Sequence, residues 1–157
     1  YGVEEHTNHK ITIMKKQLIP FILLLVLWLS CSIGPKSIDY GHVGCHFCSM
    51  TIVDKQHAAQ LVTQKGKVFN FDAIECMLNQ LKEEDLSEIA LFLVNDYEQP
   101  GKLVDATTAT YLISENVPSP MGEYLSAFAN EQTAIKIKDE EGGELYTWAE
   151  IKKRFKL

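Results

Sequence analysis

Two cysteines, a histidine and a methionine fall within six consecutive residues of this chain: Cys45-His46-Phe47-Cys48-Ser49-Met50. Sulfur ligands favour Cu(I), zinc or an iron–sulfur cluster over magnesium or calcium. A closed zinc site normally needs a second ligand pair, and no second Cys-x-x-Cys or His-x-x-x-His follows downstream. The run is therefore half of a site, and the fold must bring further sulfur to it. The candidates are Cys76, Met77 and Met121.

The amino-terminal part of the chain has the pattern of an export signal. Met14-Lys15-Lys16 is followed by a nearly continuous apolar stretch over 18–29 and then by Ser30-Cys31. Because the stretch is short and contains Pro20, we favour a cleaved signal over a retained transmembrane helix. The Ser-Cys pair is similar to a bacterial lipoprotein cleavage box, so we expect Cys31 to be lipidated at the periplasmic face of a membrane.

These features divide the chain into four parts: an upstream extension foreign to the native protein at 1–13, a signal peptide at 14–30, a lipid-anchored tether at 31–44 and a metal-binding domain at 45–157. A hydrophobic content of 46% fits one globular domain. The net charge of −6 argues against nucleic acid as a partner, because proteins that bind it present a basic face. Beyond Cys31 an odd number of cysteines remains, so at least one thiol stays free or metal-bound.

Hydrophobic patterning predicts an α+β fold. Strands are expected at 58–63, 68–71, 89–94, 102–104, 110–113 and, beginning near the cysteine run, at 50–53, with a turn at 99–101. Asp72, with Glu75 three residues later, forms a helix-start pattern, and apolar residues recur at helical spacing between 74 and 81. Together they predict a helix that ends near Glu84. A short helix is expected over 123–129.

The end of the chain shows the same order of elements as the first hairpin and helix. A strand at 134–138, a turn at 139–143 and a strand at 144–146 precede a helix that Thr147 and Glu150 cap. We therefore predict one small domain made of two related ββα-type units, in which Met50 and Met121 hold comparable places. The alternative is that this order is simply common in α+β proteins.

Several stretches, in this order, resemble the NosL family of lipoproteins: Cys48-Ser49-Met50-Thr51-Ile52-Val53-Asp54 with Ala58-Ala59-Gln60, Phe71-Asp72-Ala73-Ile74-Glu75-Cys76-Met77, Val104-Asp105-Ala106 and Ser119-Pro120-Met121-Gly122. The resemblance covers most of the mature chain. It implies a fold of two ββα-type units and a periplasmic, membrane-tethered copper chaperone that delivers Cu(I) for the copper centres of nitrous oxide reductase. The implied partners are an ABC-type transporter with its periplasmic subunit and, through it, the reductase.

The resemblance assigns copper to Cys48, Met50 and Met121, whereas Cys45 is not a required part of the family pattern. The residues support this assignment independently. Cys48 and Met50 are two apart in a run expected to be extended, so their side chains share a face. Core packing is the competing interpretation for a lone methionine. Met121 stands between two prolines and a glycine and is expected in a loop.

The secondary candidate ligands are Cys45, Cys76, Met77 and His46, with zinc as a second metal that could bind. Met77 falls on the apolar face of its helix, and Cys76 could equally be a buried, inert thiol. His42 and His57 are expected at the surface, and Asp54 and Asp72 in a turn and a helix cap rather than as ligands of a soft ion.

Three other functions remain open at this level. Cys45 and Cys48 could form the redox pair of a periplasmic thiol oxidoreductase, although such a pair usually opens a helix. Their disulfide could merely close a loop in a structural lipoprotein, or the copper could go to a different cuproprotein. The sequence has no Gly-x-Ser-x-Gly or phosphate-loop motif, so we expect no enzyme of those classes.

Overall fold

The computed structural model describes residues 33–157, which form a compact unit with its own hydrophobic core. The expected extension at 1–13, the signal peptide at 14–30 and the lipidated Cys31 lie outside the described residues. Within 33–157, no helix combines the length and the apolar character that crossing a membrane requires.

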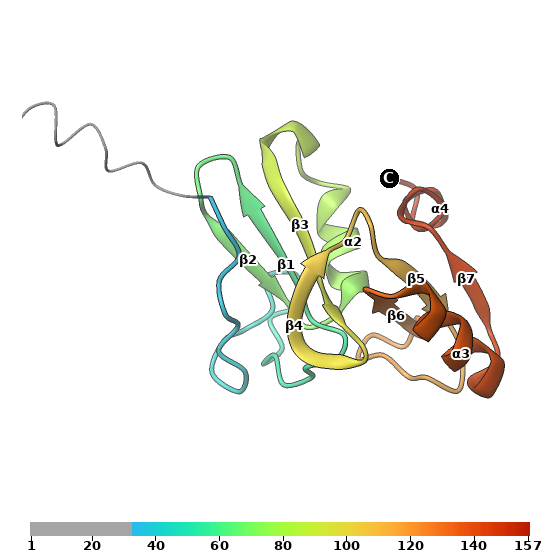
Figure 1. Ribbon diagram of the computed structural model, residues 1–157. Helices are drawn as coiled ribbons and strands as arrows, with labels where there is room; N and C mark the ends of the chain where they lie inside the picture. The colour runs from blue at the N-terminus through green and yellow to red at the C-terminus, as the bar shows by residue number, and fades with distance from the viewer. Residues whose placement is uncertain (1–32) are drawn as a thin grey trace, which may run out of the picture. The chain divides into compact units, whose positions relative to one another are not determined.

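Two antiparallel sheets form the framework of the domain (Figure 1). The first has the strand order β2-β1-β3-β4, and the second has the order β6-β5-β7. The strands are β1 (Ala59–Thr63), β2 (Val68–Phe71), β3 (Ile89–Asp96), β4 (Gln99–Asp105), β5 (Thr110–Ile113), β6 (Leu125–Phe128) and β7 (Glu144–Tyr146). As predicted, the apolar run that begins at Ile89 is a central strand, paired on one side with β1 and on the other with β4.

The helices cover these sheets: α2 (Ile74–Leu81), the short 3-10 helix η1 (Leu86–Glu88), α3 (Glu131–Glu141) and α4 (Trp148–Arg154). Helix α2 packs against β1 and β2 and also touches β6, while α3 and α4 pack against the second sheet. One buried cluster takes Leu61 and Phe71 from the first sheet, Met77 from α2, and Tyr111 and Leu125 from the second sheet. Because both sheets share this core, they form a single domain.

The predicted α+β class and its two ββα-type units are confirmed, with a different boundary for the second unit. The units are β1-β2-α2 and β5-β6-α3, so the second begins at Thr110 and not at Ala134. Met121 consequently lies in the loop inside the second hairpin, whereas Met50 precedes the first hairpin. The expected equivalence of the two methionines is therefore wrong.

Two elements of the carboxyl-terminal half differ from prediction. The helix expected over 123–129 is strand β6, which is fully buried and pairs with β5 along its whole length. The strand expected at 134–138 is part of α3, where the side chain of Asn130 accepts hydrogen bonds from the backbone N–H groups of Gln132 and Thr133. The alternating Ile-Lys-Ile-Lys sequence imitates a strand, but the capped start decides in favour of the helix.

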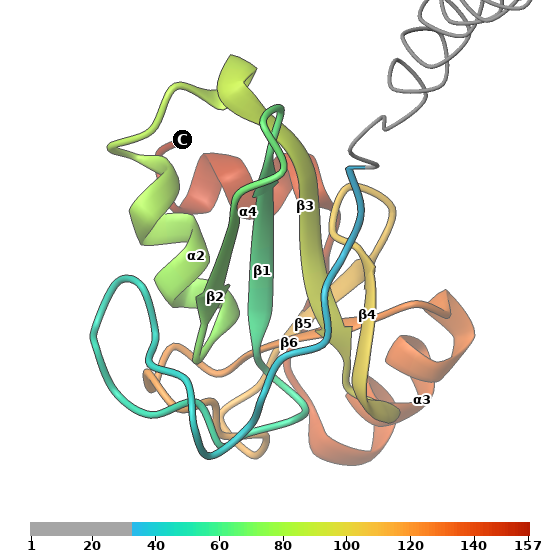
Figure 2. The ribbon, with the colours of Figure 1, turned by 90° about the vertical axis from the view of Figure 1, so that its left-hand side faces the viewer.

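The amino-terminal segment of the described chain, which is part of the expected tether at 31–44, lies on the first sheet. Figure 2 shows residues 33–44 crossing the sheet on the face away from α2. The fully buried amide of Gln60 accepts a hydrogen bond from the Lys36 backbone N–H (2.9 Å) and donates one to the Lys36 carbonyl (2.8 Å), and Ile38 is buried. A buried amide needs hydrogen-bond partners, and the backbone of Lys36 supplies them here. Strand β1 is therefore covered by α2 on one face and by this segment on the other.

Two further local predictions were wrong. Residues 50–53 do not form a strand; a single bridge joins Thr51 to Gly44. The turn expected at 99–101 lies inside β4, because the chain reverses earlier, at Tyr97 and Glu98.

Candidate metal centre

Three cysteine side chains converge at the amino-terminal end of α2. The Sγ atoms of Cys45, Cys48 and Cys76 all lie within 4.8 Å of one another, and all three are free thiols. Cys45 and Cys76 are buried, while Cys48 is half-buried. We call Cys45, Cys48 and Cys76 the thiol cluster.

A closed loop positions the first two thiols. The Cys45 backbone N–H donates to the Met50 carbonyl (2.7 Å), and the Ser49 N–H donates to the Cys45 carbonyl (2.9 Å). Ser49 has a φ of 65°, in the left-handed region, so the chain turns sharply between Cys48 and Met50. The expected extended geometry, in which Cys48 and Met50 share one face, is therefore wrong. A hydrogen bond from the His46 N–H to the Asn70 carbonyl (2.8 Å) fixes this loop to β2.

The third thiol comes from the first turn of α2. Cys76 has no exposed surface, and the helix begins directly after Ala73, whose backbone is extended and whose side chain provides no cap. Neither predicted capping side chain, Asp72 or Glu75, caps the helix. The amino end of a helix carries partial positive charge, which favours a thiolate close to it.

The cluster favours one thiolate beside two thiols. A hydrogen bond from the Cys76 thiol, helped by the backbone N–H groups of Cys48 (3.5 Å) and Asp72, outweighs burial and lowers the pKa of Cys45 to about 4. The hydrogen bond to Cys45 raises the pKa of Cys76, and burial raises that of Cys48. Burial and then the negative charge on Cys45 raise the pKa of the Asp72 carboxyl. The site therefore concentrates a single negative charge on sulfur, which suits a monovalent cation.

The methionines occupy different environments. Met50 is 46% exposed and follows the half-buried Cys48 by two residues. Met121 lies in the loop between β5 and β6. It is half-buried and packs against the core cluster that contains Cys45 and Cys76. Met77 is completely buried, as expected for the apolar face of α2.

His46 is exposed and its ring lies 4.4 Å from the ring of Phe69, centroid to centroid. It does not belong to the group of side chains that meet at the thiol cluster. The sequence named every member of this cluster, but it ranked Cys45 and Cys76 second, because their meeting depends on the packing of α2 against the loop.

His57, expected at the surface, is 3% exposed. Its Nδ1 lies 2.9 Å from Asp54 Oδ2 and its Nε2 lies 3.1 Å from Ser126 Oγ. Burial opposes ionisation of Asp54, but hydrogen bonds from His57 and Gln56 outweigh it and lower the pKa of that carboxyl. Ser126 has no exposed surface, so this Ser-His-Asp arrangement is closed to a substrate. It ties the loop ahead of β1 to β6.

A family model named NosL matches residues 35–155. The chain belongs to the NosL family. Among curated relatives, this NosL-family protein is 32% identical to the copper-binding lipoprotein NosL of Stutzerimonas stutzeri over an alignment of 115 residues, and the alignment covers 68% of this chain and 60% of the relative. It thus spans about three fifths of that relative's length.

The fold is also that of a solved NosL structure. The crystal structure of the copper chaperone NosL from Shewanella denitrificans superposes with a TM-score of 0.66 at 24% identity, covering 76% of this chain and 96% of the other. Both relatives are named for handling copper.

Proposed function

We propose that this NosL-family protein is a Cu(I) carrier whose ion is held by the thiol cluster. The observation that carries the proposal is the approach of three Sγ atoms to within 4.8 Å of one another. Metal–sulfur bonds of about 2.3 Å, as at zinc thiolate sites, place the three sulfurs of a trigonal site about 4 Å apart. The cluster therefore has the spacing that one shared ion requires.

Copper fits this donor set better than zinc. Structural zinc is almost always bound by four ligands in a tetrahedron, and the group of candidate side chains in the described part of the chain contains three. Soft thiolate and thioether donors select Cu(I). Cys48 and the exposed Met50 lie at the open side of the cluster, so they are the sulfurs through which an ion can enter and leave.

This ligand set retains Cys48, which the family resemblance assigned to copper. It makes Cys45 and Cys76 primary ligands and not secondary ones. Met50 and Met121, assigned by the resemblance, become additional thioether donors whose contribution is measured separately.

The test is a Cu(I) competition titration of the reduced domain of residues 33–157 against a chromogenic chelator. Wild type should bind one equivalent, and Ser in place of any one of the three cysteines should weaken binding by more than the roughly 10- to 100-fold typical of outer-shell changes. Met50→Leu and Met121→Leu report the thioethers, and Met77→Leu is the control, because Met77 is a buried methionine on the same helix as Cys76. Unchanged affinity in all three cysteine variants contradicts the proposal.

A thiol oxidoreductase is not favoured by the same geometry. The attacking thiol of such an enzyme is accessible and has a lowered pKa. Here the lowered pKa belongs to the buried Cys45, while burial raises the pKa of the more accessible Cys48.

We further propose that the copper serves the assembly of nitrous oxide reductase through an ABC-type transporter and its periplasmic subunit. Membership of the NosL family supports this client, and a different cuproprotein is the alternative. In cells that express the reductase, Cys48→Ser should lower the copper content of the purified reductase, whereas Met77→Leu should not. Full copper loading in the Cys48→Ser strain excludes this client.

We also propose that Cys31 is lipidated and holds the protein at the periplasmic face of the membrane. The lipoprotein name of the Stutzerimonas stutzeri relative and the leader sequence support this anchor. Replacing Cys31 with Ser should move the protein from the membrane fraction to the periplasmic fraction and abolish incorporation of labelled fatty acid. Membrane retention without the cysteine contradicts lipid anchoring there.

A further inference from the structure

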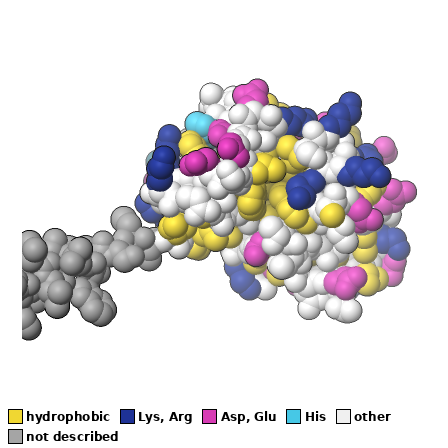
Figure 3. Space-filling view, turned by 90° about the horizontal axis from the view of Figure 1, so that it is seen from above, with side chains coloured by type: hydrophobic (Ala, Val, Ile, Leu, Met, Phe, Trp, Pro, Cys, Tyr) yellow, Lys and Arg dark blue, Asp and Glu magenta, His cyan; other side chains and the backbone are white. Residues whose placement is uncertain are grey.

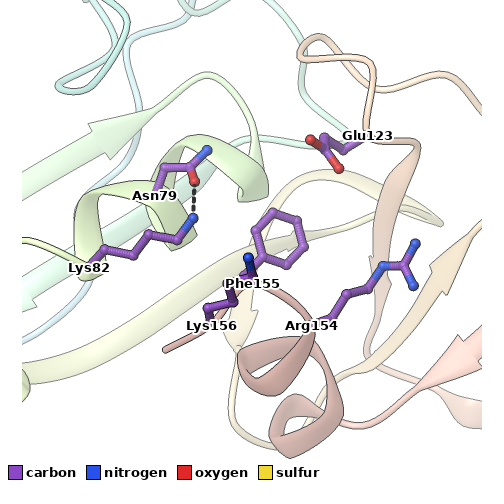
Figure 4. Close-up of a pocket in the computed structure, with 6 residues that line it drawn as sticks. All are labelled: Asn79, Lys82, Glu123, Arg154, Phe155 and Lys156. Carbon is purple, nitrogen blue, oxygen red and sulfur yellow. Dashed lines mark hydrogen bonds between the residues drawn. The ribbon is translucent and has the colours of Figure 1, made fainter.

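A second candidate binding site lies between the carboxyl-terminal ends of α2 and α4 and the loop that joins β5 to β6. Figure 4 shows this pocket, of about 490 Å³, lined by Asn79, Lys82, Glu123, Arg154, Phe155 and Lys156. It shares no residue with the thiol cluster. A concavity of this size accommodates a small molecule or one headgroup.

Three cations and one carboxylate line the pocket, in a chain whose net charge is −6. Within the described range, none of the three cations forms a salt bridge. Lys82 Nζ donates to Asn79 Oδ1 (2.7 Å) and lies 5.9 Å from the centre of the Phe155 ring. The Arg154 guanidinium lies 5.6 Å from the Tyr146 ring. Neutral partners thus hold these two cations without neutralising them.

The third cation occupies an unusual backbone position. Lys156 has a φ of 62° just after α4, where glycine is the favoured residue because a Cβ atom is strained there. Cations near the ends of α2 and α4 also complement the helix dipoles. That effect does not explain why cations of both helices line one concavity.

The loop ahead of β1, which carries Cys45 and Cys48, lies toward the lower end of the domain in Figure 2, and the carboxyl-terminal ends of α2 and α4 lie toward its upper end. Figure 3 looks onto this end and shows Lys and Arg side chains around an apolar area.

We propose that this pocket binds the phosphate group of a small phosphate ester. Arg154 offers the planar pair of donors that grips a phosphate, and Lys82 and Lys156 supply point charges. With Glu123 included, the lining carries two net positive charges, which balance a phosphate better than a carboxylate. Glu123, on the opposite wall in Figure 4, accepts a hydrogen bond from a hydroxyl or ammonium group of the same ligand. The source of the ester is either a soluble compound or a phospholipid headgroup.

The first experiment is an NMR titration of the reduced, copper-free domain with glycerol 3-phosphate and with inorganic phosphate. We expect saturable shifts around the pocket and binding about tenfold weaker in Lys82→Gln and in Lys156→Gly. The glycine variant is the decisive one, because it removes the charge while relieving the backbone, so that loss of binding is not loss of folding. Lys153→Gln removes an exposed charge of α4 outside the pocket and should change nothing. Absence of saturable shifts, or equal weakening by Lys153→Gln, overturns the proposal.

The second experiment identifies the source of the phosphate. The same variants are sedimented with vesicles of phosphatidylglycerol in phosphatidylcholine and with vesicles of phosphatidylcholine alone. Binding to the first vesicles that Lys156→Gly abolishes assigns the site to an anionic lipid headgroup. Binding of glycerol 3-phosphate without vesicle binding assigns it to a soluble ester. Cys48→Ser should leave both results unchanged, so the phosphate proposal is tested independently of the copper proposal.

Discussion

The pH dependence of Cu(I) affinity distinguishes the three-thiol site from the ligand set that the sequence favoured. Metal binding releases the protons that its ligands carry. Near neutral pH, Cys45 is already a thiolate, whereas Cys48 and Cys76 hold their protons. Coordination by all three sulfurs as thiolates therefore releases two protons, and affinity should rise about 100-fold per pH unit, or about 2.7 kcal/mol. A site of Cys48, Met50 and Met121 releases one proton, and affinity should rise about tenfold per unit.

The assay is the competition titration repeated between pH 6 and pH 8, with the pH dependence of the chelator measured in parallel. Over this range the three-thiol site predicts a total change of about 10,000-fold, against about 100-fold for the site with one thiol. Cys76→Ser should reduce the slope from two protons to one, and Met121→Leu should leave it at two. A wild-type slope of one proton refutes the three-thiol site, and a slope of zero refutes thiolate coordination by either protonated cysteine.

Two further predictions concern stability. His57→Phe leaves the buried Ser126 hydroxyl without its partner and removes a hydrogen bond from Asp54, so it should lower the unfolding free energy by about 2 kcal/mol in urea denaturation; a loss below about 0.5 kcal/mol shows that the linkage does not stabilise the domain. Burial raises the pKa of Glu75, whose Oε1 accepts a hydrogen bond from Ser119 and whose Oε2 has no hydrogen-bond partner among the described residues. A raised carboxyl pKa gives stability that is complete below the unfolded-state pKa and is lost as pH rises through the folded-state pKa. Glu75→Gln should therefore gain stability relative to wild type on going from pH 4 to pH 8 in thermal melts, and a constant difference contradicts the assignment.

Local sequence signals were sufficient for the elements from β1 to β3. The hairpin at 59–71, helix α2 and the central strand β3 follow from hydrophobic period and from turn residues between neighbours in the chain. The same is true of α4, where Thr147 and Glu150 form the predicted capping box. In each of these segments, the residues that decide the conformation lie within a few positions of one another.

The second sheet was harder to predict because its strands are short and depend on distant partners. Strand β6 has four residues, and its burial follows from pairing with β5 and from contact with α2. Helix α3 buries only Ala134, so its sequence has no strong apolar stripe to oppose the strand-like alternation of its isoleucines and lysines. Hydrophobic periodicity predicts the type of a secondary-structure element only where that element buries one face.

Patterns along the chain establish its supply of soft sulfur ligands, its resemblance to the NosL lipoproteins and its α+β class. Which of the sulfurs meet depends on tertiary packing. Cys76 joins Cys45 and Cys48 because α2 packs its first turn against a loop that Ser49 bends through the left-handed region. The meeting of a helix start and a distant loop is set by the shared core, and no spacing along the chain records it.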